Sequence, residues 1–285
     1  MILLDGSTLS DKKLNRLRDQ IKEYIDIGSR TPRLDIILVG EDFGSKKYVG
    51  MKQNRAMGLG IKCVVHEFES TVKEQEIVEL IEKLNRDERV DGLMVQLPLP
   101  KGIDSDIVLE TIDPKKDVDG LTSSNLGKLF KNDSNAIAPA TAKGILDLLK
   151  EYEIEIDGAE VVVIGRSDIV GLPTAAILQN ANATVTVCHS HTKNLKSICK
   201  RADILVVGIG KAEYIDKGYV KDGATVIDIG TNRNQEGKLV GDVKMGSVKK
   251  VAKYITPVPG GIGPMTVVSL LDNLFEVYKK NVKKF

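Results

Sequence analysis

The stretch Glu160-Val-Val-Val-Ile-Gly165-Arg-Ser167-Asp-Ile-Val-Gly171-Leu-Pro173 decides the fold of this chain. Its first part, ending at Ile164, is an apolar run that suits a strand buried on both faces of a parallel sheet. Gly165 and Gly171 follow at a turn into a helix, where the backbone can approach a pyrophosphate and the helix N-terminus offers free N–H groups. The spacing departs from the usual Gly-x-Gly-x-x-Gly, so a glycine-containing turn without a ligand fits the local pattern equally well.

Helix-like and strand-like segments alternate on both sides of this stretch. Apolar residues at helical spacing predict helices over residues 8–27, 44–57, 72–85, 142–151, 171–180, 193–200 and 264–281. Apolar runs predict strands over residues 34–39, 61–65, 92–97, 160–164, 184–188, 203–207 and 224–229, with a short strand near Tyr254. Strands separated by helix-length segments indicate βαβ units and a parallel sheet.

The chain has 285 residues, against roughly 100–200 per domain, and the alternation falls into two series. The predicted fold class is therefore α/β, with two α/β domains joined near residues 113–125 and a second domain of Rossmann type. The last helix comes after the second series is complete, so we expect it to return to the first domain. This places residues 1–120 and 265–285 in the first domain and residues 121–264 in the nucleotide-binding domain.

Composition and charge argue against several classes of protein. Hydrophobic residues make up 42% of the chain and charged residues 28%, an ordinary globular balance. The 41 Lys and Arg residues meet 40 acidic ones, and a net charge of +1 lacks the basic footprint of a dedicated nucleic-acid binder. No apolar run approaches the roughly 20 residues of a membrane span, and the start at Met1–Asp5 is too short and too soon acidic for a signal peptide. These features predict a cytoplasmic protein that binds neither nucleic acid nor a membrane.

The end of the strand after the glycine turn supports a dinucleotide site. Ser190 lies there, about 20 residues beyond the turn, where such folds contact the adenosine ribose. NAD-preferring sites usually place Asp or Glu at this point, whereas Ser190 and Arg166 offer a hydroxyl and a planar fork of donors that suit a 2′-phosphate. This pattern favours NADP. His189 and His191 are interpreted as polar loop residues, since two histidines without a third ligand make a poor metal site.

Two further segments place polar groups where chemistry could use them. Tyr48 and Lys52 are four residues apart in an expected helix and share one face, where a desolvated ammonium has a lowered pKa. A solvated amphipathic helix explains the same pair, and for the pair alone it is the better explanation. Gln96 ends an apolar strand at the carboxyl edge, where open α/β sheets bind ligands. A buried glutamine needs hydrogen-bond partners, so it serves either the structure or a ligand.

Three loop motifs have an ordinary and a functional explanation each. Lys116-Asp-Val-Asp119-Gly120 lies in the expected linker, where an Asp-Gly turn is the simpler explanation. The Pro- and Gly-rich residues 256–266 precede the last helix and either pass close to a ligand or form a rigid crossover. Residues 228–232, at the end of a late strand, indicate an ordinary turn when taken by themselves.

Together and in this order, the motifs resemble the bifunctional methylenetetrahydrofolate dehydrogenase/methenyltetrahydrofolate cyclohydrolase family. The stretches that carry the resemblance are Tyr48–Lys52, Val95–Leu99, Lys116–Gly120, Gly165–Pro173, Asp228–Asn232, Gly241–Val243 and Thr256–Thr266. They span nearly the whole chain and leave no further domain over. A shikimate dehydrogenase-like enzyme would share the glycine turn but not residues 256–266 together with residues 116–120. A non-catalytic folate- or nucleotide-binding protein could lose Lys52 without penalty, whereas this chain keeps it.

The resemblance implies NADP-dependent oxidation of 5,10-methylenetetrahydrofolate to the 5,10-methenyl compound, then hydrolysis to 10-formyltetrahydrofolate. The implied catalytic residues are Lys52, Gln96, Tyr48 and Asp119. The implied substrate-binding residues, lining a cleft between the domains, are Tyr48, Gln96, Leu97, Asp119, Pro259, Gly260, Gly261 and Pro264. The implied cofactor-binding residues are Gly165, Arg166, Ser167, Ser190 and Thr231. The family further implies a homodimer formed through the nucleotide domain, and its chemistry requires no metal.

Each catalytic residue takes a role from the resemblance. Lys52 would assist proton movement during water attack and ring opening, and Gln96 would hydrogen-bond Lys52 and tune its protonation. Tyr48 would lie against the aminobenzoyl part of folate, and Asp119 would bind the amide and amino edge of the pterin. These roles fit the chemistry, because hydride transfer mainly needs two bound carbons to be positioned, whereas the hydrolytic step needs an acid–base residue.

The chain departs from the family pattern in two places. Residues 139–144, Pro-Ala-Thr-Ala-Lys-Gly, lack the cysteine and second proline of the common Pro-Cys-Thr-Pro version, and we expect no loss of chemistry from this change. His191 stands where Lys or Arg often follows the serine, which leaves one fewer permanent cation near a 2′-phosphate. NAD therefore stays possible as a cofactor beside NADP.

Overall fold

The computed structural model describes residues 1–282, and these form two compact units. The three-stranded unit comprises residues 12–128, 134–138 and those from 270 onward, and the six-stranded unit comprises residues 1–11, 129–133 and 139–269. Helices α1 (Gly6–Asp26) and α10 (Ile262–Asn281) each begin in the six-stranded unit and end in the three-stranded unit. The predicted return of the last helix to the first domain is confirmed from residue 270 onward.

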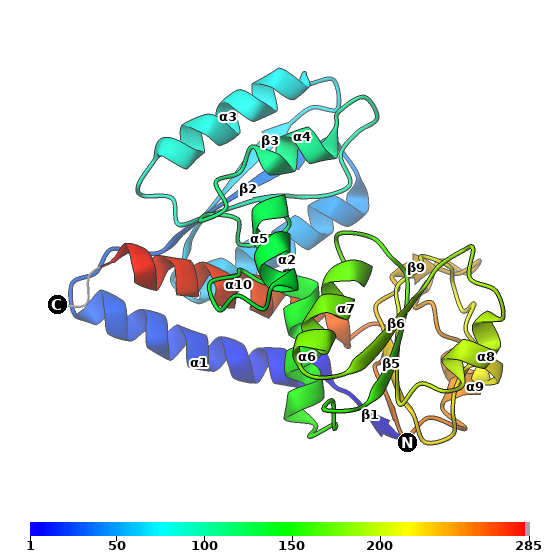
Figure 1. The fold of residues 1–285 in the computed structure, drawn as a ribbon. Coiled ribbons are helices and arrows are strands. Elements are labelled where there is room, and N and C mark those ends of the chain that lie inside the picture. Colours follow the sequence, from blue (N-terminus) through cyan, green and yellow to red (C-terminus); the bar gives the residue numbers. More distant parts are fainter. Residues whose placement is uncertain (283–285) are drawn as a thin grey trace. The chain divides into compact units, whose positions relative to one another are not determined.

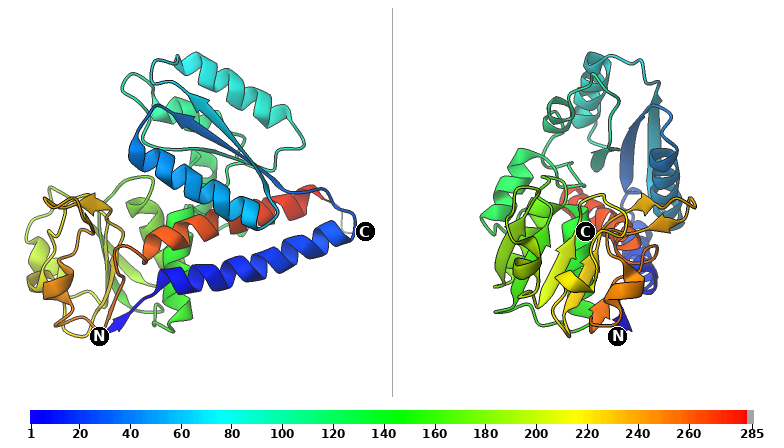
Figure 2. Two further views of the ribbon diagram at one scale, coloured as in Figure 1. Left: turned by 180° about the vertical axis from the view of Figure 1, so that it is seen from behind. Right: turned by 90° about the vertical axis from the view of Figure 1, so that its right-hand side faces the viewer.

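The three-stranded unit is built on a parallel sheet with the strand order β3-β2-β4. The strands are β2 (Arg33–Val39), β3 (Lys62–Phe68) and β4 (Gly92–Val95). Helices α3 (Glu74–Arg86) and α4 (Ser105–Glu110) cover one face of this sheet and α2 (Phe43–Gly58) the other (Figures 1 and 2). Because side chains alternate along a strand, Leu93 and Val95 join the core beneath α3 while Met94 faces α2.

An aromatic cluster joins α1 and α10 within the three-stranded unit. The ring of Tyr24 meets Phe275 edge-on with 5.6 Å between ring centres, and Tyr278 lies 5.8 Å from the same tyrosine. The Tyr278 hydroxyl donates to the carbonyl of Arg30 at 2.6 Å, which satisfies its polar end. Burying three aromatic rings in this way accounts for the docking of the last helix beside α1.

The six-stranded unit is built on a parallel sheet with the order β1-β11-β8-β7-β5-β6. The strands are β1 (Ile2–Leu3), β5 (Glu160–Ile164), β6 (Thr184–Cys188), β7 (Ile204–Val207), β8 (Thr225–Asp228) and β11 (Tyr254–Ile255). Helices α6 (Ala140–Glu151) and α7 (Gly171–Asn180) lie on one face, and α8 (Leu195–Cys199) and α9 (Met245–Val248) on the other (Figure 1). The neighbouring strands β6, β5, β7 and β8 run in parallel, so their carboxyl ends share one edge of the sheet.

The sequence predicts the long elements well and misses the short ones. The expected bounds of β5, β6 and α7 are confirmed to the residue, while β4 ends at Val95, two residues earlier than predicted. The unpredicted elements are β1, α4, α5 (Ser123–Phe130), the 3-10 helix η1 (Lys217–Tyr219), the hairpin of β9 (Asn232–Arg233) and β10 (Leu239–Val240), and α9. Among the described residues, no helix is long and apolar enough to cross a membrane.

Candidate active site

Lys52 is buried on the sheet-facing side of α2, with only 4% of its surface exposed. No other lysine or arginine within residues 1–282 is buried. Its Nζ donates a hydrogen bond to Oε1 of Gln96 at 3.0 Å and lies 3.5 Å from Sδ of Met94. The ring centre of Tyr48, one helical turn earlier, lies 5.1 Å from the same nitrogen, within the range of a cation–π contact. The structure therefore brings Tyr48, Lys52 and Gln96 together, and the exposed-helix explanation of this pair is wrong.

Burial lowers the pKa of the Lys52 amine below its ordinary value, because the charged form loses its hydration. The negative charge of Asp119 acts in the opposite direction and offsets part of this effect. An amine in this setting releases its proton more readily than an exposed lysine does. It can therefore give and take a proton near neutral pH more easily, which is what an acid–base group requires.

Gln96 directly follows β4, and its backbone N–H donates to the carbonyl of Ile37 at 2.9 Å. Its side-chain Nε2 donates to the carbonyl of Leu97 at 2.7 Å, which turns the amide oxygen toward Lys52. With both ends of the amide engaged inside the protein, Gln96 holds the Lys52 amine in one place. Leu97 itself is half-buried beside it.

Asp117 organises the loop that carries Asp119. The Asp117 side chain is buried at 1% exposure and accepts four hydrogen bonds of 2.9 to 3.2 Å. The donors are the backbone N–H groups of Gly120, Leu121 and Thr122 and Nδ2 of Asn125. The acceptor oxygens of Asp117 are therefore used within the loop itself. The neighbouring carboxylate of Asp119 takes no part in these bonds and is available for another role.

Asp119 has the opposite environment. It is partly exposed, and within the described part of the chain its carboxylate receives no hydrogen bond. Burial raises the pKa of Asp119, the charge of Asp117 adds to the rise, and the charge of Lys52 opposes it. A carboxylate that is poorly solvated, accessible and without a donor is suited to accept hydrogen bonds from a ligand.

The turn after β5 has the geometry that a dinucleotide needs. Gly165 has φ = +127°, and a Cβ there would overlap the carbonyl of Gly208, so only glycine fits. A Cβ at Gly171, the first residue of α7, would in turn overlap the carbonyl of Gly165. The Ser167 hydroxyl accepts from the N–H groups of Val170 and Gly171 at 3.2 and 3.4 Å, which closes the turn onto the helix. The N–H of Leu172 also donates to the carbonyl of Ser167 at 2.9 Å, so the first N–H groups of α7 are engaged within the protein and are not free as the sequence predicted.

The other predicted cofactor residues present unengaged polar groups. Arg166, Ser190 and Thr231 are exposed, and none of their side chains makes a hydrogen bond to another described residue. Ser190 and Thr231 follow β6 and β8, so they share the carboxyl edge of the sheet with the turn at Gly165. Free guanidinium and hydroxyl groups at this edge fit a phosphorylated ribose, and the glycine turn fits its pyrophosphate.

Residues 256–264 form a tight segment before α10. Gly260 has φ = +102°, and its carbonyl accepts the backbone N–H of Ser7 at 3.0 Å. The Ser10 hydroxyl donates to the carbonyl of Pro264 at 3.1 Å, which fixes the segment against the start of α1. Pro259 is exposed, Gly260 and Pro264 are half-buried and Gly261 is buried, so the segment is available to a ligand only in part.

The predicted site residues fall in both units. Tyr48, Lys52, Gln96, Leu97 and Asp119 belong to the three-stranded unit. Gly165, Arg166, Ser167, Ser190, Thr231, Pro259, Gly260, Gly261 and Pro264 belong to the six-stranded unit.

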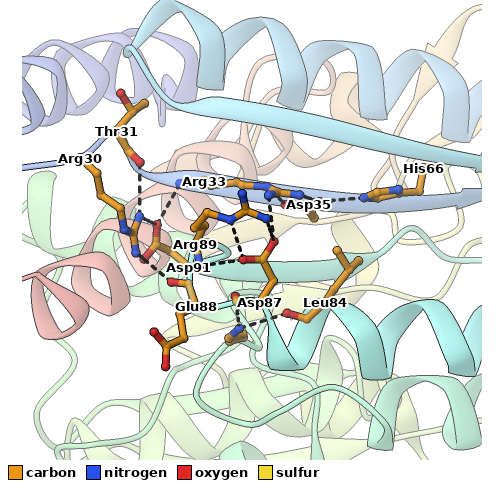
Figure 3. Close-up of polar contacts among 11 residues, drawn as sticks. Arg30, Thr31, Arg33, Asp35, His66, Leu84, Asp87, Glu88, Arg89 and Asp91 are labelled. Atoms are coloured by element: carbon orange, nitrogen blue, oxygen red, sulfur yellow. Dashed lines mark hydrogen bonds and ion pairs between the residues drawn. The ribbon is translucent and has the colours of Figure 1, made fainter.

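Two further groups of charged residues went unpredicted. One is a pair of buried carboxylates at Asp228 and Asp242 in the six-stranded unit. The other is the polar cluster of Figure 3, toward the amino edge of the three-stranded sheet. There Asp35, fully buried, accepts from Nε of Arg33 and is paired with Nε2 of His66, both at 2.7 Å. No local sequence period marks these groups, since their partners are distant in the chain.

A cavity of about 530 Å³ opens beside the cluster of Figure 3. Its lining residues are Arg33, His66, Leu80, Lys83, Leu84, Arg86, Asp87 and Arg89, so it contains none of the predicted site residues. Asp35 and Asp87 accept the guanidinium of Arg33, and Asp87 also accepts that of Arg89. These arginines and carboxylates satisfy one another, and we interpret the cluster as a brace between the strands and the loop before β4.

Comparison with known proteins places the chain in a family. Residues 4–119 match the catalytic domain of tetrahydrofolate dehydrogenase/cyclohydrolase, and residues 139–282 match its NAD(P)-binding domain. The bifunctional protein FolD of Ligilactobacillus salivarius is 50% identical over 283 residues, which cover 98% of each chain.

Solved structures agree with this match. The FolD enzyme of Campylobacter jejuni superimposes with a TM-score of 0.96 at 41% identity, covering 99% of this chain and 100% of that one. A FolD structure from Trypanosoma brucei, complexed with NADP cofactor and inhibitor, has a TM-score of 0.95 at 36% identity, with coverage of 100% and 99%. The buried Lys52–Gln96 pair, the glycine turn and these full-length similarities lead to one conclusion: the chain belongs to the tetrahydrofolate dehydrogenase/cyclohydrolase family.

Proposed function

We propose that this protein oxidises 5,10-methylenetetrahydrofolate with NADP⁺ and then hydrolyses the 5,10-methenyl product to 10-formyltetrahydrofolate. The observation that carries the proposal is the buried Lys52 amine, held by Gln96 in a chain that also has a dinucleotide turn at Gly165. Oxidation needs a hydride acceptor beside a positioned substrate, and hydrolysis needs one acid–base group. The chain supplies a separate place for each requirement.

In the oxidation, the residues of this chain bind and orient. NADP⁺, when bound, supplies the hydride acceptor. We assign its pyrophosphate to the turn at Gly165 and Ser167, its phosphorylated ribose to Arg166 and Ser190, and a further contact to Thr231. The exposed, unengaged polar groups described above fit this cofactor, and no residue has to move a proton for hydride transfer to occur.

For the folate, we assign Asp119 to the amide and amino edge of the pterin, where a carboxylate can accept two hydrogen bonds. Tyr48 offers an aromatic wall to the aminobenzoyl ring beside Lys52. Gln96 and Leu97 complete the contacts from the three-stranded unit, and we include Pro259, Gly260, Gly261 and Pro264 from the six-stranded unit.

In the hydrolysis, Lys52 moves the protons. Water adds to the methenyl carbon and loses a proton, and one C–N bond then breaks as its nitrogen takes up a proton. An amine with a lowered pKa can accept the first proton and return the second, because burial makes its neutral form more accessible than that of an exposed lysine. Gln96 accepts a hydrogen bond from Nζ and so keeps the amine aimed at the reacting carbon.

We propose residues 1–120 with 265–285 as the folate-binding catalytic domain and residues 121–264 as the NAD(P)-binding domain. We further propose a cytoplasmic homodimer formed through the nucleotide domain. Strand β6 (Thr184–Cys188) is an edge strand with half-buried residues Val185 to Val187, which suits pairing with a second copy. The thiols of Cys63, Cys188 and Cys199 are all unpaired, as is usual in a reducing compartment.

The test is a spectrophotometric assay with methylenetetrahydrofolate, run with NADP⁺ and NAD⁺ in parallel. Reduced cofactor reports the oxidation, and the methenyl absorbance reports whether the intermediate accumulates. We expect turnover with NADP⁺, slower turnover with NAD⁺ and little accumulation. Folded protein that reduces neither cofactor would contradict the dehydrogenase assignment and leave hydrolysis or binding as the remaining role.

A further inference from the structure

The carboxylate of Asp242 is completely buried at the carboxyl edge of the six-stranded sheet and accepts four hydrogen bonds. Its Oδ2 accepts the backbone N–H groups of Ile209 and Gly210 at 2.6 and 3.1 Å. Its Oδ1 accepts the N–H of Lys211 at 2.7 Å and Nδ2 of Asn232 at 2.9 Å. Three successive backbone N–H groups therefore wrap one internal carboxylate, in the way that such loops elsewhere wrap a bound anion.

A second buried carboxylate holds Asp242 in place. Oδ1 of Asp228 accepts the backbone N–H groups of Asp242 and Gly230 at 3.0 and 2.9 Å, and Oδ2 accepts that of Val243 at 3.0 Å. A Cβ at Gly241 would overlap the Asp228 carboxylate, and one at Gly230 would overlap that of Asp242. Glycine at these two positions thus provides the space for both carboxylates, and the two aspartates form one connected hydrogen-bond network.

Of the two loops that Asp242 joins, one borders the dinucleotide turn and the other carries Thr231. The first, residues 208–211, follows β7, and the carbonyl of Gly208 is the group against which Gly165 packs. The second, residues 230–232, follows β8 and carries Thr231 between two residues that are tied to the aspartate pair. Among the side chains of residues 1–282, Asp242 is therefore the one that hydrogen-bonds to both loops, and its carboxylate makes no hydrogen bond to the turn or to Thr231.

We propose that Asp242, seated by Asp228, is a positioning residue for the dinucleotide: its carboxylate holds the loops after β7 and β8 in the spacing that the cofactor requires. This inference rests on the proposed cofactor assignment of the turn at Gly165 and of Thr231. It goes beyond that assignment, because it predicts that Asp242 and Asp228, which are assigned no contact with a ligand, affect the dehydrogenase activity and not the cyclohydrolase activity.

The substitution Asp242→Asn tests the proposal with little change in shape. The amide keeps one oxygen, but its NH₂ group now faces two N–H donors, so two of the four hydrogen bonds are lost and the connection between the two loops is weakened. We expect the KM for NADP⁺ in the dehydrogenase reaction to rise about tenfold, the effect of losing roughly one or two such bonds. Cyclohydrolase activity, assayed on methenyltetrahydrofolate without cofactor, should stay within about twofold of wild type.

Asp203→Asn is the matched control. Asp203 precedes β7 at the amino edge of the same sheet, where its Oδ2 accepts the N–H of Glu160 at 2.9 Å and Oδ1 accepts Nζ of Lys221 at 2.7 Å. The same chemical change at this opposite edge should leave the KM for NADP⁺ at the wild-type value. A rise in KM with Asp203→Asn equal to that with Asp242→Asn would show a general loss of fold and overturn the proposal.

Asn232→Ala is a milder variant, since it removes only the side-chain bond between the Thr231 loop and Asp242. We expect a rise of a few-fold in the KM for NADP⁺ and an unchanged cyclohydrolase rate, which keeps the proposal testable if Asp242→Asn does not fold. Wild-type KM and kcat in both variants would overturn the proposal, as would an equal fall in both activities. Thr231→Ala, measured in parallel, tests the cofactor assignment separately from the positioning role of Asp242. If Thr231→Ala leaves the KM for NADP⁺ unchanged, the assignment of Thr231 is contradicted and the role of Asp242 is not.

Discussion

Replacing Lys52 by methionine should separate the two activities of this enzyme. Methionine has nearly the same length and volume but cannot carry a proton, so the hydrolytic step loses its acid–base group. General acid–base catalysis contributes about 10²- to 10⁴-fold, and we expect the cyclohydrolase rate to fall by that factor. The dehydrogenase should stay within about tenfold of wild type, because hydride transfer depends on positioning.

The stability of Lys52→Met is set by opposing contributions of similar size. The variant loses the 3.0 Å hydrogen bond to Gln96, about 1 kcal/mol net, and the cation–π contact with Tyr48, about 1 to 2 kcal/mol. It also removes an ammonium from a buried position, and apolar replacement of buried charged groups is often neutral or stabilising by about 1 to 4 kcal/mol. The net change should therefore lie within about 2 kcal/mol, a shift in Tm of a few degrees.

The difference in stability between Lys52→Met and the wild type should depend on pH, and the direction of this dependence follows from the pKa of Lys52. Because burial lowers the pKa of Lys52 in the folded protein from its ordinary 10.5, the unfolded chain binds more protons between the lowered pKa and 10.5. Wild-type stability contributed by Lys52 therefore rises with pH across that window. Relative to wild type, Lys52→Met should be most stable at pH values below the lowered pKa of Lys52 and should lose this advantage as the pH rises toward 10.5.

The assay follows both reactions in the same preparation, with urea unfolding at two pH values as the measure of stability. Lys47→Met is the matched control, since Lys47 lies on the same helix and is exposed. We expect this control to behave as wild type in both reactions. Hydrolysis of methenyltetrahydrofolate by Lys52→Met at the wild-type rate would refute the assignment of Lys52, and a parallel loss of both activities would show a role in binding instead.

Three other changes have expected outcomes. Gly171→Ala places a Cβ against the carbonyl of Gly165, so the KM for NADP⁺ should rise by at least about tenfold while hydrolysis persists; an unchanged KM would rule out a cofactor role for the turn. Asp117→Asn leaves two loop donors unpaired, so the free energy of unfolding in urea should fall by about 3 kcal/mol. The KM for folate should rise as well, because the same loop carries Asp119. Wild-type values for both would contradict the role of Asp117 in organising this loop. Burial raises the pKa of Asp228 from 3.8 to about 6, so between pH 4 and 6 the folded state retains a proton that the unfolded chain releases. The free energy of unfolding should therefore fall by about 3 kcal/mol across this range. Asp228→Asn should lack this pH dependence in urea unfolding, and an identical pH dependence in the variant would exclude Asp228 as its source.

The parts of the fold that the sequence predicts are those that local patterns determine. β5 and α7 have confirmed bounds because an apolar run and two glycines mark both ends of each element. β1 was missed since two residues carry no period, and its position depends on pairing with β11, about 250 residues later. α4 and the β9–β10 hairpin are equally short, and their stability comes from packing and turns rather than from propensity.

The site was predictable to a similar extent. Tyr48 and Lys52 share a helix face by their spacing alone, but the same spacing fits a solvated face. What decides between the two is Gln96, 44 residues away, which the fold brings to 3.0 Å from the Lys52 amine. No local rule contains that distance, and for this reason the motifs had to be taken together before they pointed to a function.

Four aspartates show what the sequence alone could not distinguish. Asp117 and Asp119 are two residues apart in one motif, and Asp228 and Asp242 lie in two others; only Asp119 was predicted to bind a ligand, and that choice rested on the family resemblance and not on any difference in local pattern. The structure separates them by counting donors: Asp117 and Asp242 each accept four hydrogen bonds from their own chain and Asp228 accepts three, whereas Asp119 accepts none from the described residues. A carboxylate that the protein has already saturated shapes a loop, and one left without donors at an accessible position is available to a substrate. In each unit an internal carboxylate thus prepares the loop that carries a proposed ligand contact, Asp119 in one and Thr231 in the other.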